Sequence, residues 1–141
     1  MSSKFQRSQL KLAIIPARSG SQRVKNKNIR KLHGKSLIER AIDSVLEANI
    51  RIVFSSDSEE YIKLVSRAYG KDVNTILRPP HLAENTTKVV DEVERILEIE
   101  KLDLNDYFTL LLPTSPFRTK ILFSKMLSFS IQSDKGCFSC K

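Results

Sequence analysis

The chain contains few of the residues that several common nucleotide-binding motifs require. It has four glycines in 141 residues, and no G-x-G-x-x-G stretch of the kind that binds dinucleotides. Gly34-Lys35-Ser36 matches the last residues of a Walker A loop, but the glycine that this loop needs five residues earlier is replaced by Ile29. We therefore predict that Gly34 forms a turn and that Ser36 caps a helix.

Cysteine and histidine are also scarce. Cys137 and Cys140 form a single C-x-x-C, which cannot close a structural zinc site, and neither His33 nor His81 lies at ligand spacing from it. Both cysteines are therefore predicted to be ordinary reduced thiols. Ser115 has no histidine near it in the sequence, so nothing in the chain indicates nucleophilic catalysis.

Long apolar runs are absent as well. The first ten residues are polar, and the longest apolar runs are only a few residues long, so neither a signal peptide nor a transmembrane helix fits the sequence. We expect a cytoplasmic protein with no membrane partner.

Acidic residues are missing from the first quarter of the chain. Residues 1–35 hold ten Lys or Arg and no Asp or Glu, whereas the remainder is slightly acidic, so the net charge of +8 arises at the N-terminal end. A basic arm could bind nucleic acid or simply remain solvated. Nucleic acid is the less favoured partner because these charges follow a strand inside a patterned segment.

Apolar periodicity and capping residues predict alternating strands and helices. The predicted strands are Leu10–Pro16, Ile50–Ser55, Val73–Leu77, Tyr107–Leu112 and one that starts at Cys137; the predicted helices start at Ser36, at Asp57 or Ser58, at residues 85–87 and at Ile121. This order indicates a single α/β domain, residues 1–141, with a doubly wound, mostly parallel sheet. The nearly continuous apolar run from Tyr107 to Leu112 is typical of a central parallel strand.

The loop after the first strand is the most informative segment. Residues 17–35 are crowded with Arg, Lys, Ser, Gly and Asn, a composition suited to a polyanion such as a nucleoside triphosphate. Ligands of doubly wound sheets bind beyond the carboxyl ends of the strands. We therefore expect cationic residues from several loops to converge there, namely Arg18, Lys25, Lys27, Arg78 and Arg118.

The acidic residues support simpler interpretations. Asp57 stands at a strand end, where capping of the next helix is favoured and a metal or ribose contact is the alternative. The acidic residues between positions 91 and 100, which include Glu92, are predicted to form only the solvated face of a helix.

Five segments occur in an order and spacing that resemble a known family. They are residues 15–23 (Ile-Pro-Ala-Arg-Ser-Gly-Ser-Gln-Arg), Lys27-Asn28, Ser55-Ser56-Asp57, Leu77-Arg78-Pro79 and residues 112–118 (Leu-Pro-Thr-Ser-Pro-Phe-Arg). Together they resemble the N-terminal part of the acylneuraminate (CMP-sialic acid) cytidylyltransferases, which implies a Rossmann-like nucleotidyltransferase fold.

The resemblance implies a reaction and a set of residue roles. CMP would pass from CTP to a nonulosonic acid with release of pyrophosphate and with Mg²⁺ as cofactor, and catalysis would rest on positioning and charge stabilisation. Arg18 and Lys27 would be catalytic. The implied nucleotide-binding residues are Pro16, Ala17, Arg18, Ser21, Asn28, Arg78 and Thr87, and those lining the substrate pocket are Thr114, Ser115 and Arg118.

Some positions depart from the family pattern. Leu112 replaces a glutamine, Asn85 an aspartate and Gln22 a lysine. The family's metal-binding aspartates and its dimer-forming segment would lie beyond Lys141, so we expect a truncated chain with an incomplete metal site and little turnover by itself. An inactive nucleotide-binding paralogue remains the alternative, and the acceptor could be sialic, legionaminic, pseudaminic or another acid.

Overall fold

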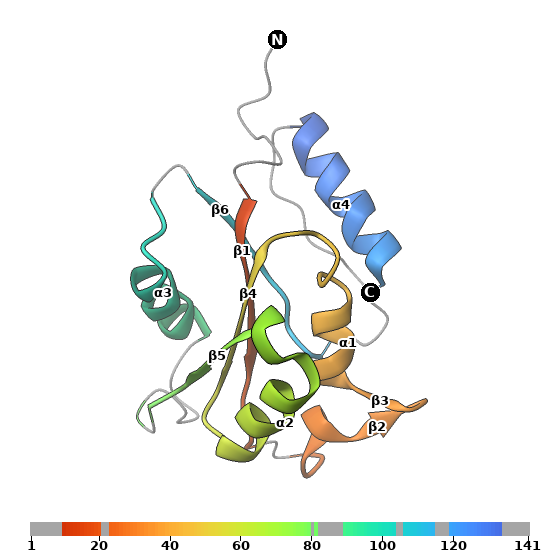
Figure 1. Cartoon of the computed structure of the whole chain (residues 1–141), viewed down its shortest axis with the longest axis vertical. Helices are drawn as coiled ribbons and strands as arrows, with labels where there is room; N and C mark the ends of the chain where they lie inside the picture. The colour runs from red at the N-terminus through yellow and green to blue at the C-terminus, as the bar shows by residue number, and fades with distance from the viewer. Residues whose placement is uncertain are drawn as a thin grey trace.

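The chain, in a computed structural model, is described at residues 10–20, 23–79, 81, 89–103, 106–114 and 119–133. Its elements are β1 (Leu10–Ala17), η2 (Lys27–Ile29), β2 (Lys31–Leu32), β3 (Lys35–Ser36), α1 (Leu37–Asp43), β4 (Arg51–Ser56), α2 (Glu59–Tyr69), η3 (Gly70–Asp72), β5 (Asn74–Leu77), α3 (Val89–Ile99), β6 (Tyr107–Leu110) and α4 (Lys120–Ser133). Within these ranges, four parallel strands form one sheet in the order β5-β4-β1-β6 (Figure 1). The predicted α/β class is confirmed.

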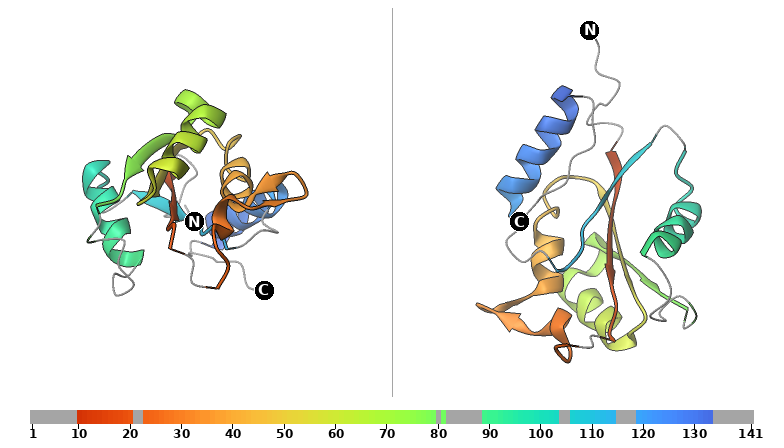
Figure 2. Two further views of the ribbon diagram at one scale, coloured as in Figure 1. Left: turned by 90° about the horizontal axis from the view of Figure 1, so that it is seen from below. Right: turned by 180° about the vertical axis from the view of Figure 1, so that it is seen from behind.

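Helices cover both faces of this sheet, with α1, α2 and α4 on one face and α3 on the other (Figure 2). The side chains of β1 alternate between the two layers, because successive residues of a strand point to opposite faces. Ala13 and Ile15 join the larger apolar cluster, and Leu12 and Ile14 pack with Ile96 of α3. Burial on both faces explains why the sequence of β1 is almost continuously apolar.

The helix starts follow from local side-chain chemistry. Ser36 caps α1 as predicted, and with Glu39 it forms a capping box in which each side chain accepts a hydrogen bond from the other's backbone N–H. At α2 the Ser58 hydroxyl accepts a hydrogen bond from the Tyr61 N–H at 3.3 Å. The favoured interpretation of Asp57 as the cap of this helix is therefore wrong, because the next residue takes that place.

Strand β6 is shorter and more exposed than predicted. It ends at Leu110 rather than Leu112, and among the described strands it pairs with β1 alone. Tyr107, Phe108 and Leu110 are each more than a third exposed. The described elements therefore cover this apolar run only in part. The strand predicted at Cys137 lies outside the described residues.

The basic segment predicted as a 19-residue loop contains regular structure. Strands β2 and β3 pair as a hairpin, with Leu32 opposite Lys35. His33 and Gly34 form its two-residue turn with φ values of 51° and 81°. Positive φ at both central positions is the type I′ pattern that suits the twist of a hairpin, and glycine adopts it without strain.

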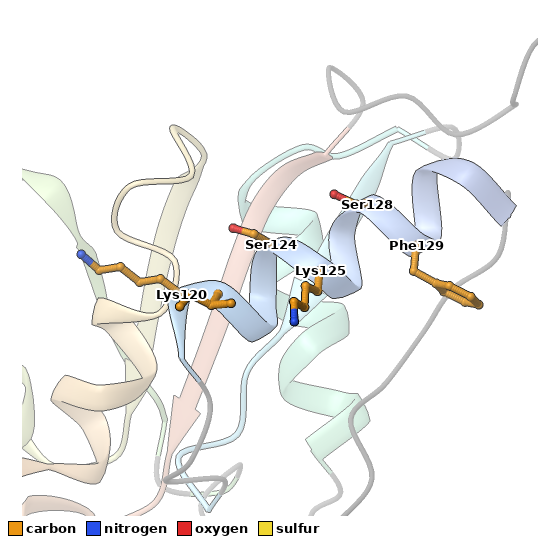
Figure 3. A pocket seen from close by; sticks show the side chains of 6 residues that line it. Lys120, Ser124, Lys125, Ser128 and Phe129 are labelled. Carbon is orange, nitrogen blue, oxygen red and sulfur yellow. The ribbon is translucent and has the colours of Figure 1, made fainter.

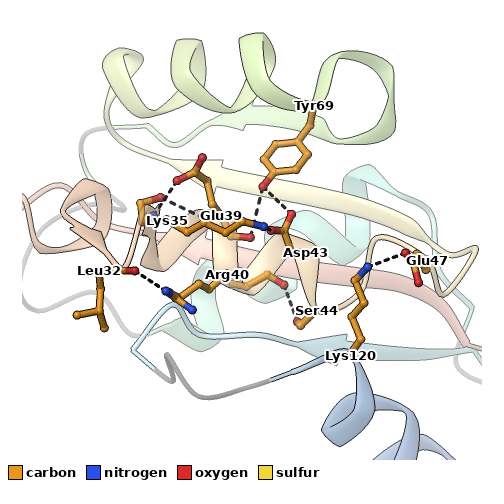
Figure 4. Close-up of polar contacts among 11 residues, drawn as sticks. Leu32, Lys35, Glu39, Arg40, Asp43, Ser44, Glu47, Tyr69 and Lys120 are labelled. Carbon is orange, nitrogen blue, oxygen red and sulfur yellow. Dashed lines mark hydrogen bonds and ion pairs between the residues drawn. The ribbon is translucent and has the colours of Figure 1, made fainter.

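Side-chain contacts fasten this hairpin to the helices (Figure 4). The Arg40 guanidinium donates to the backbone carbonyl of Leu32, and the Lys35 ammonium pairs with the carboxylate of Asp43. The Tyr69 hydroxyl of α2 donates to Asp43 at 2.9 Å. These contacts connect the hairpin to α1, and α1 to α2, and so hold this part of the basic segment against the helices.

The Tyr69 contact predicts a change in alkaline stability. Burial, together with the hydrogen bond to Asp43, raises the pKa of Tyr69 above its usual value. Since the unfolded chain ionises first, the free energy of unfolding should decrease as the pH rises above about 10. Tyr69→Phe should cost about 1 kcal/mol near pH 8 and flatten that decrease. Urea unfolding from pH 8 to 11 measures both effects, and parallel curves for the two proteins would contradict the assignment.

Candidate functional site

The carboxyl ends of three adjacent strands lie in one row. Ala17 pairs with Ser56, and Ser56 pairs with Leu77, so β1, β4 and β5 end level with one another. The Arg78 N–H extends the ladder by donating to the Ser56 carbonyl at 2.6 Å. Register therefore brings the residues that follow these strands to the same edge of the sheet, although they are far apart in the sequence.

Asp57 fastens the first loop to this edge. Its Oδ1 accepts a hydrogen bond from the Ser19 N–H at 2.8 Å, and its Oδ2 accepts one from the Ser19 hydroxyl at 2.7 Å. Both carboxylate oxygens are thus engaged with the residue that follows Arg18. Asp57 acts as an anchor for the start of the cationic loop.

Asn28 connects a second part of the loop to the residue that follows β1, Arg18. Its Nδ2 donates to the Arg18 carbonyl at 2.9 Å, and its side chain is buried. No described residue bonds its Oδ1, which leaves a buried acceptor unsatisfied beside the end of β1. Lys27, the preceding residue, is half-buried in the same 3-10 turn.

The guanidinium group of Arg78 interacts electrostatically with Arg18 and Asp57. The side chain is buried, and this burial lowers the pKa of Arg78. The carboxylates of Glu92 and Asp57 raise that pKa, whereas the positive charge of Arg18 lowers it further. The guanidinium stays charged at neutral pH. We call Arg18, Asn28, Asp57 and Arg78 the carboxyl-edge site.

The remaining predicted residues take different positions. Pro16 and Ala17 are buried as the last residues of β1, opposite Ser55 and Ser56. Thr114 is exposed on the segment that follows β6. The last contact of this segment with β1 is the hydrogen bond from the Leu111 N–H to the Ile14 carbonyl at 2.9 Å, three residues before β1 ends. Lys25 is exposed in a turn further along the loop. Four of the predicted residues, Ser21, Thr87, Ser115 and Arg118, lie outside the described residues.

Glu92 is a member of this region that was not predicted. Glu92 of α3 was predicted to be solvated, but its side chain is 1% exposed and meets Ser55, Arg78 and Arg95. A charged residue four positions before a buried Ile96 lies on the packed side of its helix, and this spacing could have indicated burial. The carboxylate of Glu92 therefore forms an ion pair with Arg78.

A shallow hollow on α4 is a separate feature (Figure 3). Lys120, Ile121, Ser124, Lys125, Ser128 and Phe129 line it, and none of these belongs to the carboxyl-edge site. The candidate site is therefore identified by converging charges and strand ends rather than by the shape of the surface.

The described residues offer no ready place for a metal ion. They contain no group of three or more His, Cys, Asp or Glu side chains that could hold one, and both oxygens of Asp57 already bond Ser19. We therefore assign no Mg²⁺ ligand among the residues that the structure describes. None of the helices in the described ranges has the length and apolar content to cross a membrane.

Comparison with known proteins gives a consistent result. Residues 12–109 match the family model described as cytidylyltransferase. The chain is 38% identical over 111 residues to N-acylneuraminate cytidylyltransferase of Escherichia coli, covering 76% of this chain and 25% of that protein. It is 41% identical to CMP-N,N'-diacetyllegionaminic acid synthase of Legionella pneumophila, covering 76% and 47%. Pseudaminic acid cytidylyltransferase of Campylobacter jejuni is 34% identical, covering 86% and 53%.

Solved structures agree on the fold. CMP:2-keto-3-deoxy-manno-octonic acid synthetase complexed with CTP superposes with a TM-score of 0.63 at 19% identity, covering 88% of this chain and 48% of that one. A cytidylyltransferase from Leptospira borgpetersenii gives 0.59 at 16% identity, covering 85% and 48%. The chain therefore spans between a quarter and about half the length of these relatives. Because its family-model match extends over most of its length, the chain belongs to the cytidylyltransferase family.

Proposed function

We propose that this chain supplies the nucleotide-binding part of an enzyme that activates a nonulosonic acid with CTP. A sugar hydroxyl would attack the α-phosphorus, forming the new P–O bond as the bond to pyrophosphate breaks. The names of its relatives support this class of reaction, and they cover several different acids, so the acceptor stays open among them. A CTP substrate also favours a cytoplasmic location.

In this proposal the cationic groups of the edge hold the phosphates. Arg18 and Lys27 would donate charge-assisted hydrogen bonds to phosphoryl oxygens and stabilise the charge that develops at the reacting phosphorus. Asp57 supports this role because it fixes the backbone of Ser19, directly beside Arg18. Mg²⁺ is part of the proposal as an ion bound to the triphosphate, and we assign it no ligands in the chain.

Recognition of the base would fall to Asn28 and the end of β1. The buried Oδ1 of Asn28 lacks a described partner, and the amino group of cytosine could donate to it. Uracil carries a carbonyl at that position and could not. The backbone at Pro16 and Ala17 would add contacts to the base, and Arg78 and Thr87 contacts to the base or ribose. Ser21 would contact the nucleotide, and Thr114, Ser115 and Arg118 would line the substrate pocket.

The observation that carries the proposal is the level ending of β1, β4 and β5, which brings Arg18 and Arg78 within electrostatic reach of each other. Calorimetric titration of the 141-residue chain with CTP, with and without Mg²⁺, tests it directly. Urea unfolding provides a second measurement: CTP at about 100 times its Kd should raise the free energy of unfolding by about 2.7 kcal/mol.

UTP provides the matched control for this titration, and it should bind at least several-fold more weakly than CTP. A single-stranded oligonucleotide tests the competing hypothesis of a basic nucleic-acid module. Strong, steeply salt-dependent oligonucleotide binding without any response to CTP would reject the nucleotide site.

A further inference from the structure

Glu92 is a buried carboxylate whose position the proposed reaction does not explain. It lies in the first turns of α3, and its side chain is 1% exposed. A carboxylate taken out of water is costly unless charge and hydrogen bonds compensate it. The contacts around Glu92 therefore indicate what keeps it there.

Three elements meet at this carboxylate. From β4, the Ser55 hydroxyl donates to Oε1. From α3 itself, Arg95 donates from Nε to Oε2 at 3.0 Å and from Nη2 to Oε1 at 2.9 Å. From the segment after β5, the Nε of Arg78 lies 3.7 Å from Oε1. One anionic group thus connects the sheet, the helix and the carboxyl-edge site.

The contact with Arg78 differs in kind from the other two. At 3.7 Å it is an ion pair but too long for a hydrogen bond. The Nε of Arg78 has no hydrogen-bond partner among the residues that the structure describes, and the side chain is only 8% exposed. Glu92 therefore attracts the Arg78 cation, although its hydrogen-bonding lone pairs are used by Ser55 and Arg95.

We propose that Glu92 is a positioning residue, which holds the Arg78 guanidinium at the sheet edge with hydrogen-bond donors left for the nucleotide. This inference rests on the proposed function, because it assigns the nucleotide as the group that Arg78 meets. A carboxylate bonded directly to Arg78 would compete with a ligand oxygen for the same donors. An electrostatic attraction at 3.7 Å, without a hydrogen bond, avoids that competition.

The test compares Glu92→Gln with a matched variant at Glu100, the residue that directly follows α3. Glu100 is also largely buried and pairs with Arg51 of β4 at 3.0 Å, but Arg51 lies at the opposite end of that strand. Each substitution removes one carboxylate that contacts the sheet, from α3 at Glu92 and from the residue after α3 at Glu100. Glu92→Gln should raise the Kd for CTP about tenfold, a typical effect of removing support from a binding group, whereas Glu100→Gln should change it less than twofold. Glu92→Asp, which retains the charge, should recover part of the affinity.

A double-mutant cycle shows whether the effect passes through Arg78. In an Arg78→Met background, Glu92→Gln should cost almost nothing further in CTP affinity. Additive effects, or a Glu92→Gln protein that binds CTP as the unaltered chain does, would overturn the inference while leaving the proposed function intact.

A ligand-independent readout separates the two hypotheses. The Nε–H NMR signal of Arg78 should be protected from exchange in the unaltered chain and broaden or vanish in Glu92→Gln, but not in Glu100→Gln. A chain that fails to bind CTP would reject the proposed function, and the NMR comparison would still decide whether Glu92 holds Arg78. An unchanged Arg78 signal in Glu92→Gln would overturn the inference.

Discussion

Arg18→Ala is expected to weaken CTP binding by roughly ten- to a hundredfold. A hydrogen bond between charged groups contributes about 1.5–3 kcal/mol, and the site would lose both this bond and the charge beside Arg78. The backbone anchors of the loop, Ser19 on Asp57 and Asn28 on the Arg18 carbonyl, do not involve the Arg18 side chain. The free energy of unfolding should therefore change little. Calorimetric titration with CTP measures the affinity, and urea unfolding the stability.

Arg30→Ala is the control for charge alone. Arg30 is an exposed residue of the same cationic segment, directly after η2. Its removal lowers the net charge by the same amount and should change the Kd by less than threefold. Lys27→Ala should resemble Arg18→Ala. Equal losses in all three variants would indicate a diffuse electrostatic attraction and remove Arg18 and Lys27 from the site.

Phe54→Ala should lower the free energy of unfolding by about 3–5 kcal/mol. Phe54 is fully buried in the middle of β4, paired in register with Ile15 and Thr75, and belongs to the apolar cluster beneath α1 and α2. Truncation to alanine removes a large apolar surface and leaves a cavity that the close-packed sheet cannot fill. Urea unfolding followed by circular dichroism measures the loss.

Leu64→Ala is the matched control for this core substitution. Leu64 is also an apolar residue, but it lies on α2 with 44% of its surface exposed. Its truncation should cost less than about 1 kcal/mol. Similar losses for Phe54 and Leu64 would mean that the cluster beneath the helices does not determine stability as its burial indicates.

Local signals predicted much of the fold. The apolar run of β1 and the helix cap at Ser36 are each encoded within a few residues, and both are confirmed. The convergence of Arg18 and Arg78 was also predictable, because parallel strands present their carboxyl ends at one edge. These predictions required no knowledge of which helix covers which face.

The errors concern residues whose environment depends on contacts between distant elements. Asp57 and Ser58 are both good caps, and the choice between them depends on Ser19, which lies 38 residues earlier and occupies the Asp57 carboxylate. Glu92 was predicted to be exposed because its neighbours are charged, whereas its burial depends on Ser55 and Arg78 from other elements. The hairpin in the basic segment is short, and its two-residue turn was predicted only in part, from Gly34.

The level row of Ala17, Ser56 and Leu77 has a consequence for how such a chain can vary in length. Deleting one residue inside β5 would draw Arg78 back by about 3.3 Å and turn its side chain to the opposite face of the sheet. Adding a residue at the turn between β2 and β3 would leave that row unchanged. Tolerated insertions and deletions should therefore concentrate in the hairpin and avoid the strands. The hydrogen-bond ladder fixes where Arg18 and Arg78 follow the ends of β1 and β5, and a change in strand length would shift one relative to the other.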